Sequence, residues 1–415
     1  MLHTFAASVL EEKLTQLKDV SQVEQLETSN YAEKYVVRFT QPIDHKHPEA
    51  GTFTQRVVIN HKGFDRPTVI VTEGYGANYA LSPRYQDELS LLLGTNVVVV
   101  EHRYFLESTP EPLNWDYLTA ENSAYDLHHI TTTLKPLYTG KWISTGISKG
   151  GQTVMIYRTF FPDDVDISVP YVAPLCQSRE DGRHEVFLRK VGTKGERKQI
   201  KAFQTEALRR KDRMLPLLER FCQEKQMSFR IPMAEVLDYC VLEYSFAFWQ
   251  WGTSVSTIPA LTSDDKVIFD HLMNIAGPDY FAENSPTVSF FVQAAKELGY
   301  YGYDVKPFRK YLTINTATGY LEKIMLPESA GHITFNETLY HKIYNYLKDN
   351  DPQMIFIYGE VDPWSAVHAP EFKGKKNEHF YFQPRGSHRT RISNMPEATK
   401  NEIIALLKNW LANSQ

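Results

Sequence analysis

The pattern of apolar and polar positions changes character early in the chain. Residues 10–26 have helical spacing with mixed charge, which predicts a short helix or an N-terminal arm. The runs at 35–39 and 53–59 partly alternate between apolar and polar side chains, which favours an antiparallel hairpin. From residue 68 the apolar runs are continuous, as in strands that are covered on both faces of a parallel sheet.

Continuous apolar runs then alternate with helical patterns as far as residue 174. Strands are expected at 68–72, 96–100, 141–145 and 167–174. Helices are expected between them at 82–93, 119–135 and 152–160. This alternation predicts parallel strands joined by right-handed crossovers.

Ser148 lies between one expected strand and the next expected helix. Residues 146–150 read Gly-Ile-Ser-Lys-Gly, a G-x-S-x-G pattern. The pattern alone is common in ordinary turns, but a strand before it and a helix after it are the context of a nucleophile elbow. Gly150 and Gly151 would let the helix pack closely against its neighbours.

Beyond residue 176 the alternation stops and the chain is mainly helical. Helices are expected at 199–224, 234–251, 263–275 and 288–298. The sheet resumes with strands at 353–358 and 378–382, and the chain ends in an amphipathic helix at 396–412.

These patterns together predict an α/β-hydrolase fold with a mostly parallel sheet. The catalytic domain would comprise residues 1–176 and 327–415. The helical residues 177–326 would form a cap domain over the active site.

Acyl transfer by a serine needs a base that takes the hydroxyl proton and an acid that orients the base. In α/β-hydrolases these groups follow the order nucleophile, acid, histidine along the chain. Asp362 and His388 each follow a late expected strand, in that order after Ser148. We therefore predict Ser148, Asp362 and His388 as the catalytic residues.

Other residues compete for two of these roles. Glu360 is an alternative acid, although Asp362 lies further into the loop and precedes a proline. His368 is close to Asp362 in sequence, and His379 opens an expected strand, so His388 is the preferred base.

The oxyanion formed during acyl transfer also needs hydrogen-bond donors. One donor would be the backbone N–H of Lys149, directly after the nucleophile. The other would be the amide of Tyr75, in the loop after the first buried strand. The alternative role of the flanking glycines, Gly74 and Gly76, is to form a tight turn.

The composition of the 415 residues is that of a globular protein, with 42% hydrophobic and 23% charged residues. A net charge of −5 gives no basic field for nucleic acid or an anionic membrane, so neither is expected as a partner. No run approaches ~18 consecutive apolar residues, so no membrane span is expected. The N-terminus lacks a basic segment followed by a long apolar run, so no signal peptide is expected.

The sequence gives little support to metal or disulfide chemistry. His45 and His47 lack partners at metal-site spacing. Cys176, Cys222 and Cys240 are too few for a disulfide framework, although a bridge between Cys222 and Cys240 stays open. The chain has no phosphate loop, dinucleotide fingerprint or H-E-x-x-H motif, so hydrolysis without a cofactor or metal is expected.

Five segments, in order, resemble the bacterial prolyl tri/tetrapeptidyl aminopeptidases, which are distantly similar to the prolyl carboxypeptidases and dipeptidyl peptidases. They are residues 101–104 (Glu-His-Arg-Tyr), 145–151 (Thr-Gly-Ile-Ser-Lys-Gly-Gly), 248–252 (Phe-Trp-Gln-Trp-Gly), 358–364 (Tyr-Gly-Glu-Val-Asp-Pro-Trp) and 386–392 (Gly-Ser-His-Arg-Thr-Arg-Ile). The resemblance implies a secreted or periplasmic serine exopeptidase that removes tri- or tetrapeptides from free N-termini, often after proline. Its catalytic residues fall on Ser148, Asp362 and His388.

An aminopeptidase must also bind an ammonium group, which in a partly dry pocket needs a carboxylate partner. Glu243 and Glu297 in the expected cap are the candidates, and both have the alternative of an ordinary structural glutamate. Trp249, Trp251 and Tyr300 are candidate flat walls against a proline ring, with core packing as the alternative.

Two other functions stay open at this point. An esterase or lipase would use the same three residues, because the triad does not choose between ester and amide. A non-catalytic binding protein on the same scaffold is the third possibility. The oligomeric state is not readable from the sequence.

Overall fold

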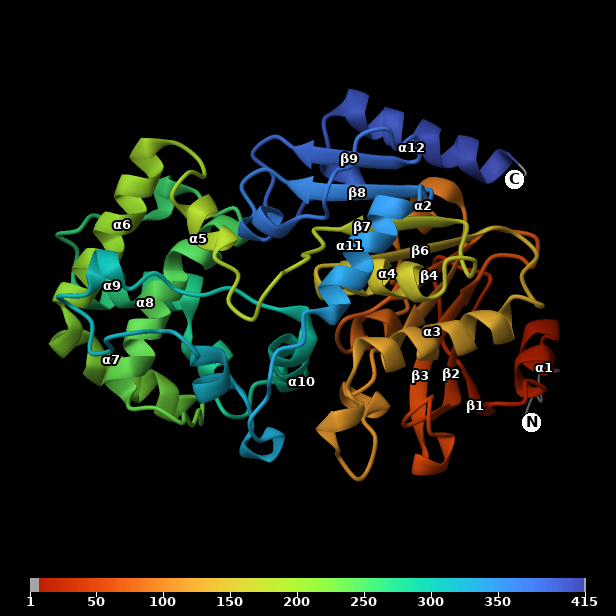
Figure 1. The fold of residues 1–415 in the computed structure, drawn as a ribbon, viewed down its shortest axis with the longest axis horizontal. Coiled ribbons are helices and arrows are strands. Elements are labelled where there is room, and N and C mark those ends of the chain that lie inside the picture. The colour runs from red at the N-terminus through yellow and green to blue at the C-terminus, as the bar shows by residue number, and fades with distance from the viewer. Residues whose placement is uncertain (1–6, 414–415) are drawn as a thin grey trace, which may run out of the picture.

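Residues 7–413, which the computed structural model describes, form a twisted nine-stranded sheet with helices on both faces and a second, helical half beside it (Figure 1). The order of the strands across the sheet is β1-β2-β3-β5-β4-β6-β7-β8-β9. Their bounds are β1 Val20–Gln25, β2 Glu33–Pro42, β3 Thr52–His61, β4 Thr68–Thr72, β5 Asn96–Val100, β6 Trp142–Ile147, β7 Ile167–Tyr171, β8 Met354–Gly359 and β9 Glu378–Gln383.

The sheet is antiparallel at one end and parallel over the rest. β1, β2, β3 and β5 pair antiparallel, whereas β5, β4, β6, β7, β8 and β9 pair parallel. Every residue of β4, β5, β7 and β8 is buried, which explains the continuous apolar runs of these strands in the sequence. The predicted α/β-hydrolase fold and the predicted hairpin are confirmed.

Helices cover both faces of this sheet. The apolar side chains of α2 (Glu88–Leu93) and α12 (Glu397–Ala412) pack on one face, against residues such as Val71 and Ile357. On the opposite face lie α3 (Ala120–Leu134), α4 (Lys149–Phe160) and α11 (Thr338–Asp349), while the short α1 (Val9–Thr15) packs there beside β2 and β3. The carboxyl ends of the parallel strands therefore form the edge where loops can build a site.

The second half of the molecule is helical and lies to the left in Figure 1. Its helices are α5 Arg183–Leu188, α6 Lys194–Arg209, α7 Lys211–Glu224, α8 Met233–Gln250, α9 Asp265–Ala276 and α10 Val288–Gln293, which continues as a π-helical turn at Ala294–Leu298. α8 is buried along most of its length and contacts α6, α7 and α9. The division into a catalytic domain and a cap, with boundaries at residues 176 and 327, stays a prediction.

The expected helix at 10–26 is wrong in its second half. α1 ends at Thr15, and Val20–Gln25 is the edge strand β1, which pairs with β2. Most β1 side chains are exposed or half-buried and polar, so the strand leaves no clear apolar alternation in the sequence. The hydrogen-bonding edge of β2 makes this segment a strand.

Two other helical predictions need correction. The helix expected at 82–93 begins only at Glu88, because the Asp87 side chain accepts the Leu89 N–H at 2.8 Å and caps the helix there. The helix expected at 199–224 is two helices, and the chain bends at Arg210 between them.

The bridge left open between Cys222 and Cys240 does not form, because the three cysteines are free thiols and buried. Among residues 7–413, no helix is long and apolar enough to cross a bilayer.

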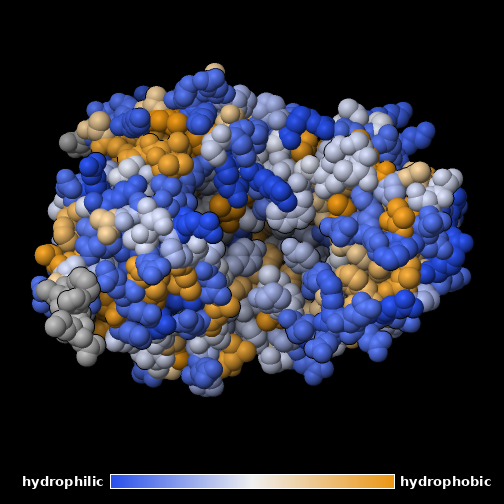
Figure 2. Space-filling model, turned by 180° about the vertical axis from the view of Figure 1, so that it is seen from behind, coloured by the Kyte–Doolittle hydropathy of each residue, from blue (hydrophilic) through white to orange (hydrophobic). Residues whose placement is uncertain are grey.

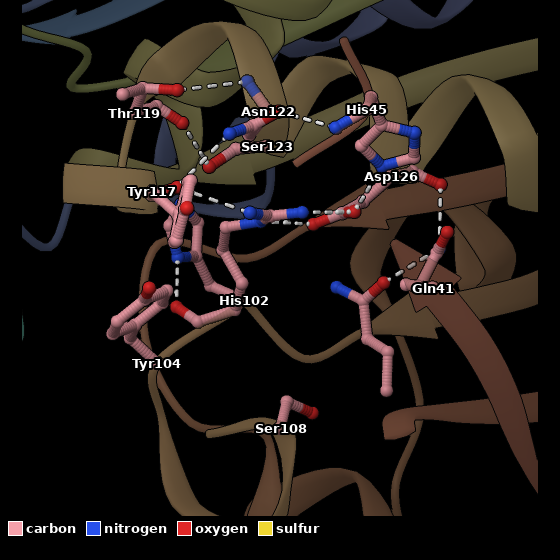
Figure 3. Close-up of polar contacts among 12 residues, drawn as sticks. Gln41, His45, His102, Tyr104, Ser108, Tyr117, Thr119, Asn122, Ser123 and Asp126 are labelled. Atoms are coloured by element: carbon pink, nitrogen blue, oxygen red, sulfur yellow. Dashed lines mark hydrogen bonds and ion pairs between the residues drawn. The ribbon is translucent and has the colours of Figure 1, made fainter. Parts of the chain in front are cut away.

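A buried ion pair ties the loop after β5 to α3 and to the β2–β3 hairpin. The Arg103 guanidinium donates two hydrogen bonds to Asp126, at 2.6 and 2.7 Å, and both side chains are fully or almost fully buried. Arg103 also donates to the carbonyl of Ile43 at 2.8 Å, and His45 lies 2.7 Å from the Asp126 carboxylate. Figure 3 shows Asp126 with His45 beside it, so this histidine has a structural role.

Replacing Asp126 with Asn should therefore destabilise the protein by about 3 to 5 kcal/mol, because the buried Arg103 charge loses its counter-charge. The measurement is the free energy of unfolding in urea. Glu121→Gln is the matched control, since Glu121 also lies on α3 but pairs with an exposed Lys46, and it should leave stability nearly unchanged. Equal effects of the two changes would contradict the structural role of the buried pair.

Candidate active site

Ser148 occupies a strained turn between β6 and α4. Its backbone has φ +59° and ψ −121°, a conformation that residues other than glycine rarely adopt. The Ser148 N–H donates to the Tyr171 carbonyl of β7 at 2.9 Å, which fixes the turn against the neighbouring strand. The half-buried side chain faces a large pocket.

Glycines around Ser148 let three segments of backbone approach one another. A Cβ on Gly146 would lie 2.4 Å from the Gly150 carbonyl oxygen, and one on Gly150 would lie 2.8 Å from the Thr72 carbonyl oxygen. A Cβ on Gly151 would lie 2.7 Å from the Tyr171 carbonyl oxygen. The glycines of the motif are therefore required by close packing of α4 against β4, β6 and β7.

Asp362 and His388 come from the loops after β8 and β9 and contact each other. His388 Nδ1 lies 2.7 Å from Asp362 Oδ2, and Asp362 is fully buried. The other oxygen of Asp362 accepts the Trp364 N–H at 3.1 Å. Because a carboxylate only accepts, this contact places the proton on Nδ1 and leaves Nε2 to accept.

The competing residues lie elsewhere. Glu360 accepts the Arg385 N–H at 2.8 Å, His368 bonds the Ala369 carbonyl at 2.7 Å, and His379 packs on Trp410. Of the three histidines, only His388 lines the pocket that Ser148 faces.

The two predicted oxyanion donors lie on segments that touch. A Cβ on Gly74 would lie 2.6 Å from Lys149 Cβ, so the loop that carries Tyr75 packs directly on the start of α4. The Lys149 side chain is buried and its Nζ donates to the Gly74 carbonyl at 2.7 Å. Burial lowers the pKa of Lys149 well below its usual value. Within residues 7–413, neither the Tyr75 nor the Lys149 amide donates to a protein acceptor.

The pocket beside Ser148 has a volume of about 780 Å³ and is lined by both halves of the molecule. The sheet half contributes Ser148, His388 and Trp364, and the helical half contributes aromatic and acidic side chains of α8 and of the segment 280–301. Seen from behind, the surface is hollowed near its middle, between the two halves (Figure 2).

Glu243 lies in this pocket and is almost completely buried. The Tyr301 and Tyr303 hydroxyls donate to its carboxylate at 3.0 and 2.8 Å. Burial raises the pKa of Glu243 to about 7, because desolvation outweighs the two hydrogen bonds. Among the described residues, no Lys, Arg or His forms an ion pair with Glu243.

The structure separates the other predicted binding residues into two groups. Trp251 and Tyr300 line the pocket with Ser148. Glu297 does not, because its carboxylate accepts the Ala120 N–H at 2.6 Å at the start of α3 and lines a different cavity. Trp249 is also absent from the pocket, because its buried ring packs on Gly192 and lines a cavity on the other side of α8. Core packing, the alternative considered for this tryptophan, is what the structure shows.

The family described as PS-10 peptidase S37 matches residues 5–414. The chain belongs to the peptidase S37 family. The prolyl tri/tetrapeptidyl aminopeptidase of Streptomyces mobaraensis is 30% identical over 387 residues, which cover 90% of this chain and 79% of that protein. The serine protease vicPb of Bipolaris victoriae is 33% identical over 147 residues, 30% of this chain and 27% of that protein. The solved proline iminopeptidase of Mycobacterium smegmatis is 12% identical, with a TM-score of 0.41 and coverage of 90% of this chain and 98% of that one.

This S37 chain is therefore a serine peptidase, and its resemblance to the prolyl tri/tetrapeptidyl aminopeptidases is confirmed.

Several residues of the S37 pocket were missed in the sequence. They are Tyr280, Phe290, Tyr301 and Trp364, which line the pocket, and Tyr303, which holds Glu243. Tyr301 and Tyr303 stand beside the predicted Tyr300, and Trp364 follows the predicted acid by two positions, so neighbours of predicted residues were the available signal. Tyr280 and Phe290 carry no such signal.

The strain at Ser148 gives a stability test that is independent of activity. Ser148→Gly should be about 1 kcal/mol more stable than Ser148→Ala. Glycine relieves backbone strain of about 1 to 3 kcal/mol in the folded state, and this gain exceeds the cost of its greater conformational freedom in the unfolded chain. Urea unfolding of both variants measures this difference. At Asn401, which is exposed on α12, the glycine variant should instead be less stable than the alanine variant, since glycine destabilises a helix relative to alanine. A glycine variant less stable than the alanine variant at both positions would contradict strain at Ser148.

Proposed function

We propose that this peptidase removes tri- or tetrapeptides from free N-termini, preferably after proline, through an acyl-enzyme on Ser148. The observation that carries the proposal is Glu243, a buried carboxylate that has no cationic partner among residues 7–413 and lies in the same pocket as Ser148 and His388. We also propose a secreted or periplasmic location, which rests on the family resemblance alone.

In the proposed reaction, His388 Nε2 takes the proton of the Ser148 hydroxyl as its oxygen attacks the scissile carbonyl carbon. Asp362 holds the imidazole through Nδ1 and stabilises the imidazolium that forms. The amides of Tyr75 and Lys149 donate to the oxyanion. His388 then protonates the leaving amine, and a water molecule activated by the same imidazole hydrolyses the ester.

Glu243 would bind the substrate's ammonium group, with the two tyrosine hydroxyls holding the carboxylate in place. The charged amine offsets the cost of burying Glu243, and an acetylated N-terminus cannot do so. A fixed anchor on one side and Ser148 on the other limit the number of residues between the N-terminus and the cleaved bond. The rings of Trp251 and Tyr300 lie along the pocket, where they offer flat apolar walls to a proline.

Glu243→Gln should raise KM for peptides with a free N-terminus by about 30-fold, because losing a buried charge pair costs about 2 kcal/mol or more. The assay is hydrolysis of unblocked and N-acetylated peptidyl-proline substrates, with product lengths read by mass spectrometry. Discrimination against the acetylated substrate should shrink in the variant.

Glu297→Gln is the matched control, because its amide oxygen still accepts the Ala120 N–H outside the pocket. It should leave KM and product length unchanged. If Glu243→Gln also leaves both unchanged, Glu243 is not the amine anchor.

The raised pKa of Glu243 also predicts a pH dependence of binding. The carboxyl is largely neutral below its pKa of about 7, so affinity for a free-N-terminal peptide should rise from about pH 6 to about pH 7.5. Above that range affinity should fall, because the peptide's α-amine, with a pKa of about 7.7 to 8.0, loses its charge. Titrating the inactive Ser148→Ala variant with a peptide measures this, and Glu243→Gln in the same background should lose the acidic limb. If the rise of affinity between about pH 6 and about pH 7.5 persists in the double variant, it is caused by the titration of a group other than Glu243.

A further inference from the structure

We propose that Trp251 and the backbone carbonyl of Gln250 position His388, so that the helical half holds the histidine of the active site in place. Trp251 would then be a positioning residue, in addition to any contact with the substrate. The proposal rests on His388 being the general base.

The end of α8 contacts His388 directly. The carbonyl of Gln250 accepts the His388 N–H at 2.9 Å. The Trp251 and His388 rings lie at 87° to each other with centres 5.9 Å apart, an edge-to-face contact. The chain then turns at Gly252, where a Cβ would lie 3.0 Å from Ser387. Three consecutive residues of the helical half therefore lie against residues 387–388.

The same loop is tied to the helical half at two further points. The Arg389 guanidinium lies 5.6 Å from the centre of the Trp251 ring, so this ring contacts both His388 and Arg389. Arg385 donates two hydrogen bonds to Glu196 near the start of α6, at 2.5 and 3.2 Å. The loop that carries His388 is thus attached to two helices on the other side of the pocket.

The sheet half contacts the His388 ring through Trp364, whose ring centre lies 6.5 Å away, farther than that of Trp251, and through one hydrogen bond at Nδ1. Asp362 binds Nδ1 at 2.7 Å, and the Arg391 guanidinium donates to the His388 carbonyl at 3.2 Å. One hydrogen bond at Nδ1 allows the ring to pivot about that bond. The Gln250 carbonyl fixes the backbone nitrogen, and the Trp251 ring limits the pivot. Both contacts keep Nε2 in one place, and such alignment contributes strongly to the rate of acyl transfer.

α8 also carries the proposed amine anchor. Glu243 and Gln250 are seven residues apart, which is two helical turns, and both line the pocket with Ser148. One rigid helix therefore sets the position of the substrate's N-terminus and that of the base. The two roles separate in kinetics, because Glu243 acts on substrate binding, whereas Trp251 also acts on the chemical step.

The test measures the rate at which a small fluorophosphonate labels Ser148, together with kcat and KM for a free-N-terminal peptide. Trp251→Ala should slow labelling and lower kcat by about 10- to 100-fold, because misalignment of the base slows bond formation, whereas any rise in KM would report the separate contact of this ring with the substrate. Trp251→Phe should recover most of the rate, because a ring remains to contact His388. Trp251→Leu keeps an apolar side chain without a ring and should resemble the alanine variant.

Tyr311→Ala is the matched control, since Tyr311 is another aromatic residue of the helical half with an arginine 5.7 Å from its ring centre. It should label at the wild-type rate. Wild-type labelling of Trp251→Ala and Trp251→Leu, with or without a raised KM, would overturn the positioning role. His388→Ala distinguishes the two proposals, because wild-type labelling of that variant would refute His388 as the base and with it the proposed mechanism.

Discussion

Close contact between backbone segments at Ser148 is the constraint on which the rest of the site depends. α4 can begin directly above β4 and β7 only because Gly146, Gly150 and Gly151 have no side chains. That contact forces the backbone of Ser148 into a strained conformation, and the hydrogen bond to Tyr171 holds it there. The turn would relax without neighbours on both sides, so the serine is exposed to the pocket by packing rather than by local preference.

The same contact explains why the lysine after the nucleophile is buried. With the Gly74 loop pressed against Lys149, its side chain has no route to solvent and instead bonds the Gly74 carbonyl. The two segments that carry the proposed oxyanion donors, the amides of Tyr75 and Lys149, are thereby fixed relative to each other. Rigid spacing of such donors is what allows them to favour a transition state over a substrate.

The sequence predicted the sheet and the three proposed catalytic residues because both depend on order along the chain. A strand, a turn and a helix are local features, and Asp362 and His388 could be placed by the strands before them. β1 could not be found, because an edge strand with exposed polar side chains has no apolar signal and forms only against β2.

Glu243 and Glu297 look alike in sequence, and only packing shows that one faces the pocket while the other caps α3. Likewise Trp249 and Trp251 differ by two positions at a helix end, and nothing local says which one faces His388.

The route of the chain makes the helical half part of the proposed active site. It leaves the sheet after β7 and returns through α11 to β8, the strand that precedes Asp362. The segment that leads from β7 into it is attached to the Asp362 loop, since the Leu175 N–H donates to the Val367 carbonyl at 2.7 Å. Its α8 reaches the pocket from the other side, with Glu243 on the same face as Gln250. A displacement of the helical half would thus shift Glu243 and the loops that carry Asp362 and His388. Substrate recognition and the geometry of the proposed catalytic residues therefore depend on one packed structure, not on two independent parts.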